Sequence, residues 1–116
     1  MATLHNPNDT VTLNPGVLLT IVRMATTAVD GVVRTVSPSG GVDRWFRRTS
    51  TEDGLRVEVD DSGVLVELYL IVDATHSLHE TCRRVQEEVS RTIKEFAGMN
   101  VSAVNVHIED VVFGTE

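Results

Sequence analysis

The sequence holds a single cysteine, Cys82, and very few aromatic residues, which make up 4% of the chain. One thiol allows no disulfide within the chain, and a metal site ligated by several thiols is not expected. With so few rings, the hydrophobic core must be built mainly from valine, leucine, isoleucine and alanine. The expected fold is therefore one held together by aliphatic packing.

Positive charge is also scarce, since ten basic residues stand against seventeen acidic ones and give a formal net charge of −7. Because neutralising phosphates takes a surplus of lysine and arginine, this balance disfavours nonspecific binding to nucleic acid. The first ten residues do not form a signal peptide, and no run approaches the roughly 20 apolar residues that span a bilayer. We therefore expect a cytoplasmic protein without direct membrane insertion, which could be peripheral at a membrane only through a partner.

A single domain of residues 10–116 is expected after a flexible N-terminus of residues 1–9, because 116 residues suffice for one modest core. Asn14 and Pro15 are typical of a helix start, where asparagine caps the first turn and proline loses no hydrogen bond. Apolar residues then recur at helical spacing to about residue 28. Gly31 suits the C-terminal cap of this helix.

A second helix is predicted after Ser77 and Glu80, which form the pattern of a capping box. Gly98 should end it. An apolar stripe runs along this helix through Leu78, Cys82, Val85, Val89, Ile93 and Phe96. Its outer face is expected to carry two ion pairs, Glu80–Arg84 and Glu87–Arg91.

Alternating apolar residues predict short strands at residues 10–13, 32–37, 55–60, 64–72 and 101–109. The sequence Asp60-Asp61-Ser62-Gly63 is typical of a hairpin turn, whereas residues 38–54 show no regular pattern. The resulting order is β-α-β-β-β-α-β. It predicts an α+β two-layer sandwich, with a mixed sheet and two helices on one face. The connection through the second helix is long enough for a right-handed crossover.

Three stretches carry a resemblance to a known family: VLLTIVRMATTAVDGVVR (17–34), GLRVEVDDSGVLVELYLIVD (54–73) and VNVHIEDVVF (104–113). They resemble the alkaline shock protein family, the envelope-stress proteins of Gram-positive and related bacteria, in a minimal short form. The resemblance implies a single alkaline-shock-type α+β domain without enzymatic activity. It also implies a cytoplasmic protein that self-associates and is held near the membrane by a membrane-anchored partner.

A metal site could be drawn from His76, His79, His107, Asp73, Glu109 and Asp110. The spacing of His76 and His79 straddles a helix N-terminus, however, so the two rings need not share a face, and no further helical ligand follows at i+4. Cys82 lies in an apolar stripe, where a thiol is inert, and no serine sits on a nucleophile elbow. We expect no metal, no cofactor and no enzymatic activity.

The most unusual chemistry is a basic and aromatic run formed by Arg44, Trp45, Phe46, Arg47 and Arg48. Arginine and aromatic anchors are typical of protein interfaces, and a basic aromatic loop could also contact anionic lipid headgroups or nucleic acid. In the alternative interpretation, the two rings pack inward to cap the sheet and the arginines pair with acidic neighbours. The sequence leaves both interpretations open.

The strand at 64–72 is apolar on both faces. One face carries valines and leucines, and the other, which should be wet, carries Leu65, Tyr69 and Ile71. We predict that this second face meets another protomer or another segment of the chain.

The strand at 101–109 should place Val104, Val106 and Ile108 on the helices and their neighbours in water. After a bend at Asp110, the run of residues 111–113 is expected to pack as an apolar latch, over its own sheet or onto a neighbouring subunit. The reason is that leaving Val112 and Phe113 exposed would forgo roughly 1.5–3 kcal/mol of burial per side chain.

Two functions from different classes fit these observations. The favoured one is an interaction or adaptor protein that forms homo-oligomers, binds a membrane-anchored protein and takes part in cell-envelope stress or homeostasis. The alternative is a small α+β domain that binds single-stranded RNA on its sheet. Tyr69 is the only aromatic residue on a predicted strand and the chain is acidic, so the first is preferred.

Overall fold

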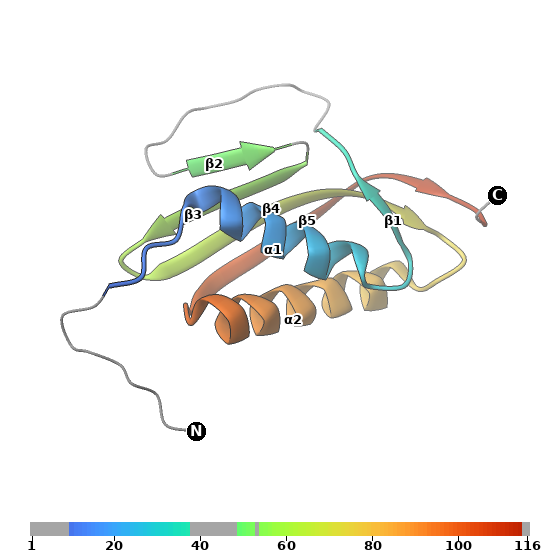
Figure 1. Ribbon diagram of the computed structural model, residues 1–116. Helices are drawn as coiled ribbons and strands as arrows, with labels where there is room; N and C mark the ends of the chain where they lie inside the picture. Colours follow the sequence, from blue (N-terminus) through green and yellow to red (C-terminus); the bar gives the residue numbers. More distant parts are fainter. Residues whose placement is uncertain (1–9, 38–48, 53, 115–116) are drawn as a thin grey trace.

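The computed structural model describes residues 10–37, 49–52 and 54–114 and shows a five-stranded sheet with both helices on one side (Figure 1). The elements are α1 (Pro15–Thr27), β1 (Val32–Thr35), β2 (Thr49–Glu52), β3 (Leu55–Asp60), β4 (Gly63–Asp73), α2 (Leu78–Ala97) and β5 (Val101–Val112). Strand β5 runs parallel to β4, while the other pairs are antiparallel. The predicted α+β class, with a mixed sheet and two helices on one face, is confirmed.

Two strand assignments differ from the sequence-based prediction. Residues 10–13 form no strand but an exposed lead-in to α1, in which Val11 is 87% exposed. Conversely, β2 lies within the segment that shows no sequence pattern, and pairs residue by residue with β3. The order is therefore α-β-β-β-β-α-β. The predicted flexible N-terminus, residues 1–9, lies outside the described residues.

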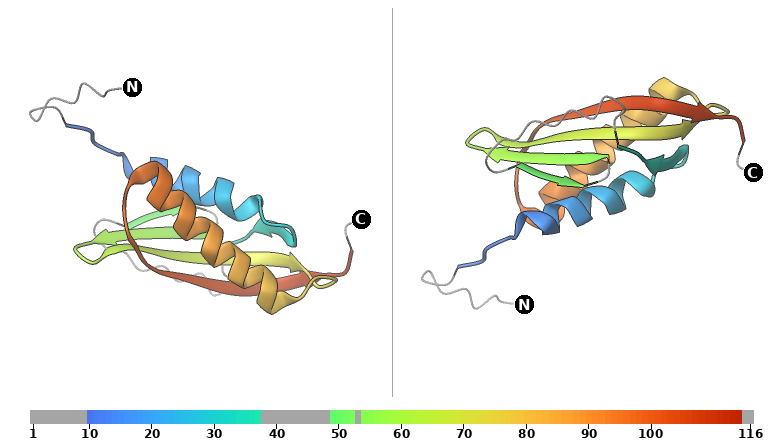
Figure 2. Two further views of the ribbon diagram at one scale, coloured as in Figure 1. Left: turned by 90° about the horizontal axis from the view of Figure 1, so that it is seen from below. Right: turned by 90° about the horizontal axis from the view of Figure 1, so that it is seen from above.

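The long strand β4 organises the sheet, because it is paired along both of its edges (Figure 2). On one edge, β3 pairs with its first half and β1 with its second half. Tyr69 marks the junction: its N–H donates to the Gly54 carbonyl and its C=O accepts from the Val36 N–H, both at 2.9 Å. The other edge is occupied by β5.

The core lies between this strand and the helices. Side chains of β4 that point toward the helices are completely buried, and they are Val64, Val66, Leu68, Leu70 and Val72. From the helices, Val22, Val85, Val89 and Ile93 meet them with equally complete burial. Burial of each such side chain is worth about 1.5–3 kcal/mol, so this single aliphatic layer carries most of the stability.

The start of α1 follows the prediction and its end does not. The Asn14 side chain accepts a hydrogen bond from the Gly16 N–H at 2.8 Å, as expected of an N-cap. The helix stops at Ala28 in ordinary right-handed geometry, so Gly31 is not its cap. Gly31 instead turns the chain into β1 with φ of 101°, where an added Cβ would lie 2.8 Å from the Thr81 hydroxyl of α2. Glycine is needed there for both the turn and the close approach of α2.

Both predicted ends of α2 are confirmed. Ser77 accepts a hydrogen bond from the Glu80 N–H, and Gly98 adopts the left-handed conformation and donates to the Lys94 carbonyl. Only this half of the predicted capping box is formed, because the Glu80 carboxylate accepts hydrogen bonds from Arg83 and Arg84. A correction concerns both ends of the predicted apolar stripe, because Leu78 is 36% and Phe96 67% exposed.

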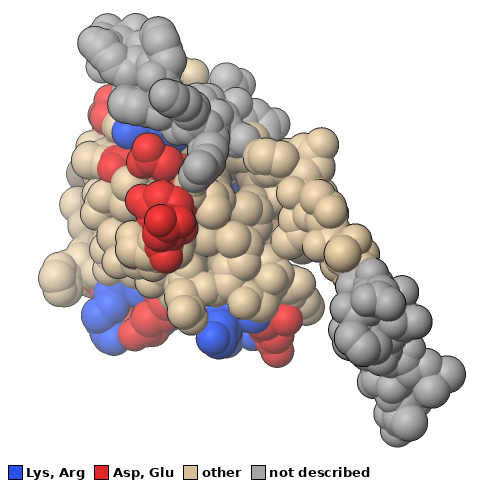
Figure 3. Space-filling model, turned by 90° about the vertical axis from the view of Figure 1, so that its left-hand side faces the viewer, with Lys and Arg blue, Asp and Glu red and all other residues tan. Residues whose placement is uncertain are grey.

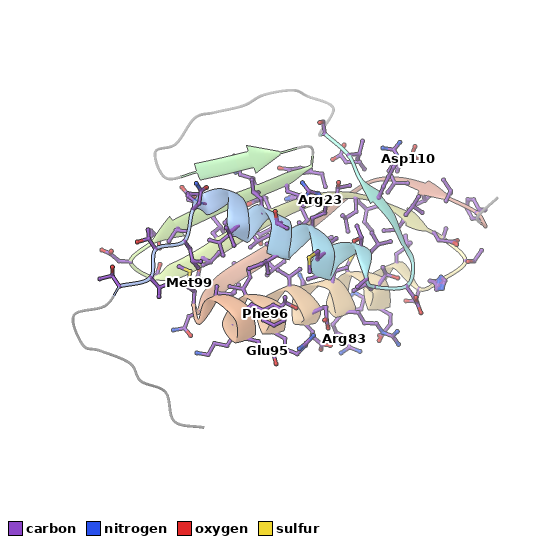
Figure 4. The ribbon with its side chains drawn as sticks, in the orientation of Figure 1. Arg23, Arg83, Glu95, Phe96, Met99 and Asp110 are labelled. Atoms are coloured by element: carbon purple, nitrogen blue, oxygen red, sulfur yellow. The ribbon has the colours of Figure 1, made fainter. Side chains whose placement is uncertain are left out.

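The outer face of α2 carries a ladder of exposed ion pairs, of which Arg83 and Glu95 are labelled in Figure 4. The predicted pair Glu80–Arg84 is present. The predicted pair Glu87–Arg91 is not the one formed: the contacts are Glu87–Arg83, Glu88–Arg91 and Glu95–Arg91. All connect residues three or four apart, and exposed pairs of this kind contribute a few tenths of a kcal/mol each.

Candidate functional site

The face of the sheet that points away from the helices holds the best-organised group of polar side chains. The parallel register of β4 and β5 aligns Glu67 with Asn105 and Tyr69 with His107. Neighbouring strands lie about 4.8 Å apart, so aligned side chains on one face must touch. We refer to these four residues as the open-face cluster.

Glu67 is the centre of the open-face cluster. One carboxylate oxygen lies 2.7 Å from His107 Nε2, and the other accepts a hydrogen bond from Asn105 Nδ2 at 2.9 Å. The His107 ring stacks on the Tyr69 ring, with centroids 4.7 Å apart and planes 13° from parallel. The Glu67 side chain is 16% exposed and that of His107 is 44% exposed. The imidazole is therefore held from two sides while one side remains open to solvent.

The sequence singled out Leu65, Tyr69 and Ile71 on this face, and His107 only as a candidate metal ligand. Leu65 and Tyr69 are half-buried, whereas Ile71 is 8% exposed and is mostly covered by its own chain. Glu67 and Asn105 were not recognised, because their meeting depends on the register between β4 and β5. The predicted crossover connection implies that these two strands run parallel, but it does not fix which of their residues are aligned.

The basic and aromatic run Arg44, Trp45, Phe46, Arg47 and Arg48 lies outside the described residues. Its proposed role in binding a partner stays a prediction.

The C-terminal strand is longer than expected. Asp110 does not end it: the register shifts there by a bulge, and β5 continues to Val112, whose carbonyl accepts a hydrogen bond from the Ala74 N–H at 2.7 Å. The predicted orientation of Val104, Val106 and Ile108 toward the helices is confirmed by their burial. Phe113 is 79% exposed, so no latch of this ring over its own sheet is formed. Contact of Val112 and Phe113 with a neighbouring subunit stays a prediction.

Asp73, one of the candidate metal ligands, is occupied by hydrogen bonds at the end of β4. Its Oδ1 accepts from the Thr75 N–H at 2.9 Å, from the Thr75 hydroxyl at 2.7 Å and from the Gly114 N–H at 3.3 Å. The Thr75 N–H, followed by the Thr75 hydroxyl, lowers the pKa of this carboxyl from its ordinary value. Asp73 thus links the C-terminal end of β4 to the C-terminal end of β5. Residues 10–37, 49–52 and 54–114 contain no group of three side chains placed to hold a metal ion.

A catalytic nucleophile is also not apparent in the described residues. Cys82 is half-buried in α2, and burial raises the pKa of its thiol. A raised pKa leaves little of the reactive thiolate at neutral pH. The thiol is therefore poorly reactive, although it is only half-buried in the predicted stripe.

The helical layer exposes apolar side chains that the sequence analysis did not anticipate. Val17 is 41%, Met24 55% and Phe96 67% exposed. Figure 3 views the end of the molecule where α1 begins, and shows broad uncharged surface between separate charged spots. One side of α1 therefore faces solvent with few charged residues on it.

The arrangement of the open-face cluster suits protein contacts better than nucleic acid. A base-binding sheet needs free aromatic rings and positive charge around them. Here the Tyr69 ring is already stacked on His107, and a carboxylate stands at the centre of the cluster.

The chain matches the sequence model of one protein family over residues 3–113, described as the alkaline shock protein 23 family with a cell envelope-related function. The chain belongs to this family. Among its relatives, YqhY of Bacillus subtilis is 28% identical over 108 residues, which cover 91% of this chain and 79% of YqhY. Spy1535 of Streptococcus pyogenes serotype M6 is 26% identical over 103 residues, covering 88% of this chain and 78% of Spy1535.

Similar folds are found among solved structures. The copper form of the MamM CTD superposes with a TM-score of 0.57 at 17% identity, over 87% of this chain and 90% of that chain. A variant of the same domain gives a TM-score of 0.58 at 17% identity, over 84% of this chain and 98% of that chain. At this identity the likeness of the alkaline shock domain to these domains shows a shared fold alone. Within the described residues, no helix has the length and apolar character needed to cross a membrane.

Proposed function

We propose that this protein is a non-enzymatic adaptor in the cytoplasm that serves the cell envelope by self-association and by docking to a membrane-anchored protein. The cell envelope-related function of its family supports the envelope role. The pKa of the Cys82 thiol, which burial raises, supports the non-enzymatic part of the proposal.

The observation that carries the docking role is the open-face cluster itself. Glu67 holds the His107 ring, and the Tyr69 ring stacks on it, so little side-chain freedom remains to be lost when a partner binds. Tyrosine is among the residue types that most often dominate interface energies. Leu65 lies next along the same face of β4 and extends the surface with an apolar side chain.

The proposal extends the docking role to residues outside the open-face cluster. Arg44, Trp45, Phe46, Arg47 and Arg48 supply the anchors of an interface, and Val112 and the exposed Phe113 add apolar area at the end of β5. Ile71 is an interior support of this surface, since most of its side chain is already covered.

The docking role is tested by comparing two single substitutions on opposite layers. Tyr69→Asp places a charge on the open face, and Phe96→Asp places the same charge on the exposed side of α2. Tagged proteins are crosslinked in native cells, membranes are isolated and the bound membrane protein is quantified. We expect at least about a tenfold loss of recovery for Tyr69→Asp and less than a twofold change for Phe96→Asp.

Thermal unfolding of both variants serves as the control for folding. A midpoint within about 5 °C of the unsubstituted protein corresponds to roughly 1 kcal/mol or less in a domain of this size. Undiminished membrane recovery of a folded Tyr69→Asp protein would contradict docking through the open face. Recovery of RNA in place of a membrane protein would favour the alternative function.

A further inference from the structure

Strand β5 forms one edge of the sheet in the described part of the chain, and its unpaired backbone groups can be identified from the register. Tyr69 uses its N–H and C=O toward β1 and β3, so the neighbouring even-numbered residues of β4 bond toward β5. The bond from the Val64 N–H to the Asn100 carbonyl at 2.9 Å agrees with this assignment. The even-numbered residues of β4 are aligned in the pairs Val66–Val104, Leu68–Val106 and Leu70–Ile108.

In a parallel ladder, the residue aligned with a bonding residue turns its own N–H and C=O to the opposite side. Val104, Val106 and Ile108 therefore point their backbone groups away from the sheet, whereas Asn105 and His107 bond to β4. The side chains of the first three meanwhile point toward the helices.

The two ends of this free edge are closed by side chains of the chain itself. Gln86 Nε2 donates to the Val104 carbonyl at 3.1 Å, and Asp110 Oδ1 accepts from the Val111 N–H at 2.8 Å. Between them, the described part of the chain provides no partner for the N–H and C=O groups of Val106 and Ile108.

Edge strands are usually protected against pairing by charged side chains, proline, bulges or shortness. The sequence of β5, VSAVNVHIEDVV, contains neither lysine nor proline, and its twelve residues make it the longest strand described. Its acidic residues and its two register shifts lie outside the stretch of residues 103–108. Its edge is therefore closed at two points and left open to another strand between them.

We propose that β5 pairs antiparallel with β5 of a second copy of this chain, about a two-fold axis at His107. In this register Val106 lies opposite Ile108 of the second copy, and each such pair exchanges two hydrogen bonds. Four hydrogen bonds then use every free group between the two closed ends. This inference rests on the proposed function, because it names the surface through which the adaptor self-associates.

Charge and apolar area favour a second copy in this orientation. Antiparallel pairing about His107 places Glu109 near the neutral Asn105 of the other copy. A parallel arrangement would instead align Glu109 and Asp110 with their own counterparts and repel. Val106 and Ile108 are half-buried at the sheet edge, and the second copy would cover their exposed parts. Continuation of a sheet across an edge is a known mode of strand recognition.

The register is tested by cysteine crosslinking in a Cys82→Ser background, which removes the single native thiol. Across the axis, His107 faces itself in a non-hydrogen-bonded pair, with Cα atoms about 4.5 Å apart. This separation allows a disulfide, so His107→Cys should form a covalent dimer under mild oxidation. Asn105→Cys is the matched control: it faces Glu109, and we expect at least about tenfold less dimer. Equal crosslinking of both, or none of His107→Cys, overturns the proposal.

The free edge is tested separately with proline, which removes one N–H. Val106→Pro removes an N–H that does not bond to β4, so the protein should fold and its dimer should weaken at least about tenfold in sedimentation velocity. His107→Pro removes an N–H that belongs to the ladder, and should lose the fold. Self-association unchanged in Val106→Pro overturns the proposal.

Amide exchange in the unsubstituted protein keeps the test decisive if Val106→Pro does not fold. The Val106 and Ile108 amides should exchange at least about tenfold more slowly at high than at low protein concentration. Concentration-independent exchange overturns the proposal, as does protection by a different protein without self-association.

Different results would contradict the pairing through β5 and the docking through the open face. A protein that stays monomeric but is still recovered with membranes contradicts edge pairing and leaves docking intact. A dimer crosslinked through His107→Cys, together with undiminished membrane recovery of Tyr69→Asp, contradicts docking through the open face instead.

Discussion

The two faces of β4 are both rich in apolar residues but are buried in different ways. Toward the helices, five aliphatic side chains are completely buried in one continuous layer. On the open face, Leu65 and Tyr69 are half-buried, and between them Glu67 holds Asn105 and His107. The difference teaches that alternation in a sequence separates two faces without saying which one is solvated. One face of this strand is a closed aliphatic layer, and the other combines half-buried apolar side chains with hydrogen-bonded polar ones.

The largest loss of stability should come from shortening a side chain on the face of β4 that the helices cover. Leu68→Ala removes a completely buried side chain and leaves a cavity, which costs about 2–5 kcal/mol of unfolding free energy. Leu65→Ala is the matched control on the opposite face of the same strand. It is half-buried and should cost about 1 kcal/mol or less. Urea unfolding measures both, and equal losses would contradict the contrast between the faces.

Gly31→Ala should cause the next largest loss of stability, because it disturbs the close contact between the turn before β1 and helix α2. The added Cβ would lie 2.8 Å from the Thr81 hydroxyl, at a φ of 101° that side chains rarely adopt. Strain at such a position costs about 1–3 kcal/mol. Gly98→Ala is the control: its φ is 67°, but nothing lies within 4 Å of the added Cβ. A smaller fall in the thermal midpoint for Gly31→Ala than for Gly98→Ala would show that the contact with Thr81 is easily relieved.

The sequence predicted those parts of the fold that depend on neighbours along the chain. Asn14 and Ser77 cap their helices, Gly98 ends α2, and the hairpin turn before β4 is formed as expected, with the Asp60 carboxylate accepting from the Ser62 N–H. Each of these features is decided by three or four consecutive residues.

Features that depend on a distant element were missed. Strand β2 is defined by its hydrogen bonds to β3, and its residues TSTE show no alternation. Phe96 lies at the angle of the apolar stripe, but helical periodicity does not say whether another element reaches that end of α2. Glu67 and His107 meet only because β5 aligns with β4 in one particular register.

A substitution of Thr26 should have a smaller effect on the free energy of unfolding, and it should stabilise the protein. Its side chain is completely buried, and the described part of the chain provides no hydrogen-bond partner for its hydroxyl. An unsatisfied buried polar group costs about 1–3 kcal/mol, so the nearly isosteric Thr26→Val should raise unfolding free energy by about 1 kcal/mol. Thr92→Val is the control, because the Thr92 hydroxyl donates to the Glu88 carbonyl at 2.7 Å. It should not stabilise the protein, and equal gains from both would contradict the explanation.

The smallest effect concerns the acid dependence of stability at the end of β4. Hydrogen bonds from Thr75 and Gly114 lower the pKa of Asp73 from its ordinary value of 3.8, so folding favours the charged carboxylate. Its contribution is fully present above that ordinary value and is lost as the pH falls through the lower pKa of the folded protein. Asp73→Asn can still accept these hydrogen bonds but does not titrate, so its stability should fall less below pH of about 4.

Asp61→Asn, exposed in the hairpin turn, removes the same formal charge and should keep the acid dependence of the unsubstituted protein. Urea midpoints compared between pH 5 and pH 2 provide the measurement. Parallel curves for the Asp73→Asn and unsubstituted proteins would mean that the hydrogen bonds from Thr75 and Gly114 do not distinguish the charged carboxylate from the neutral one.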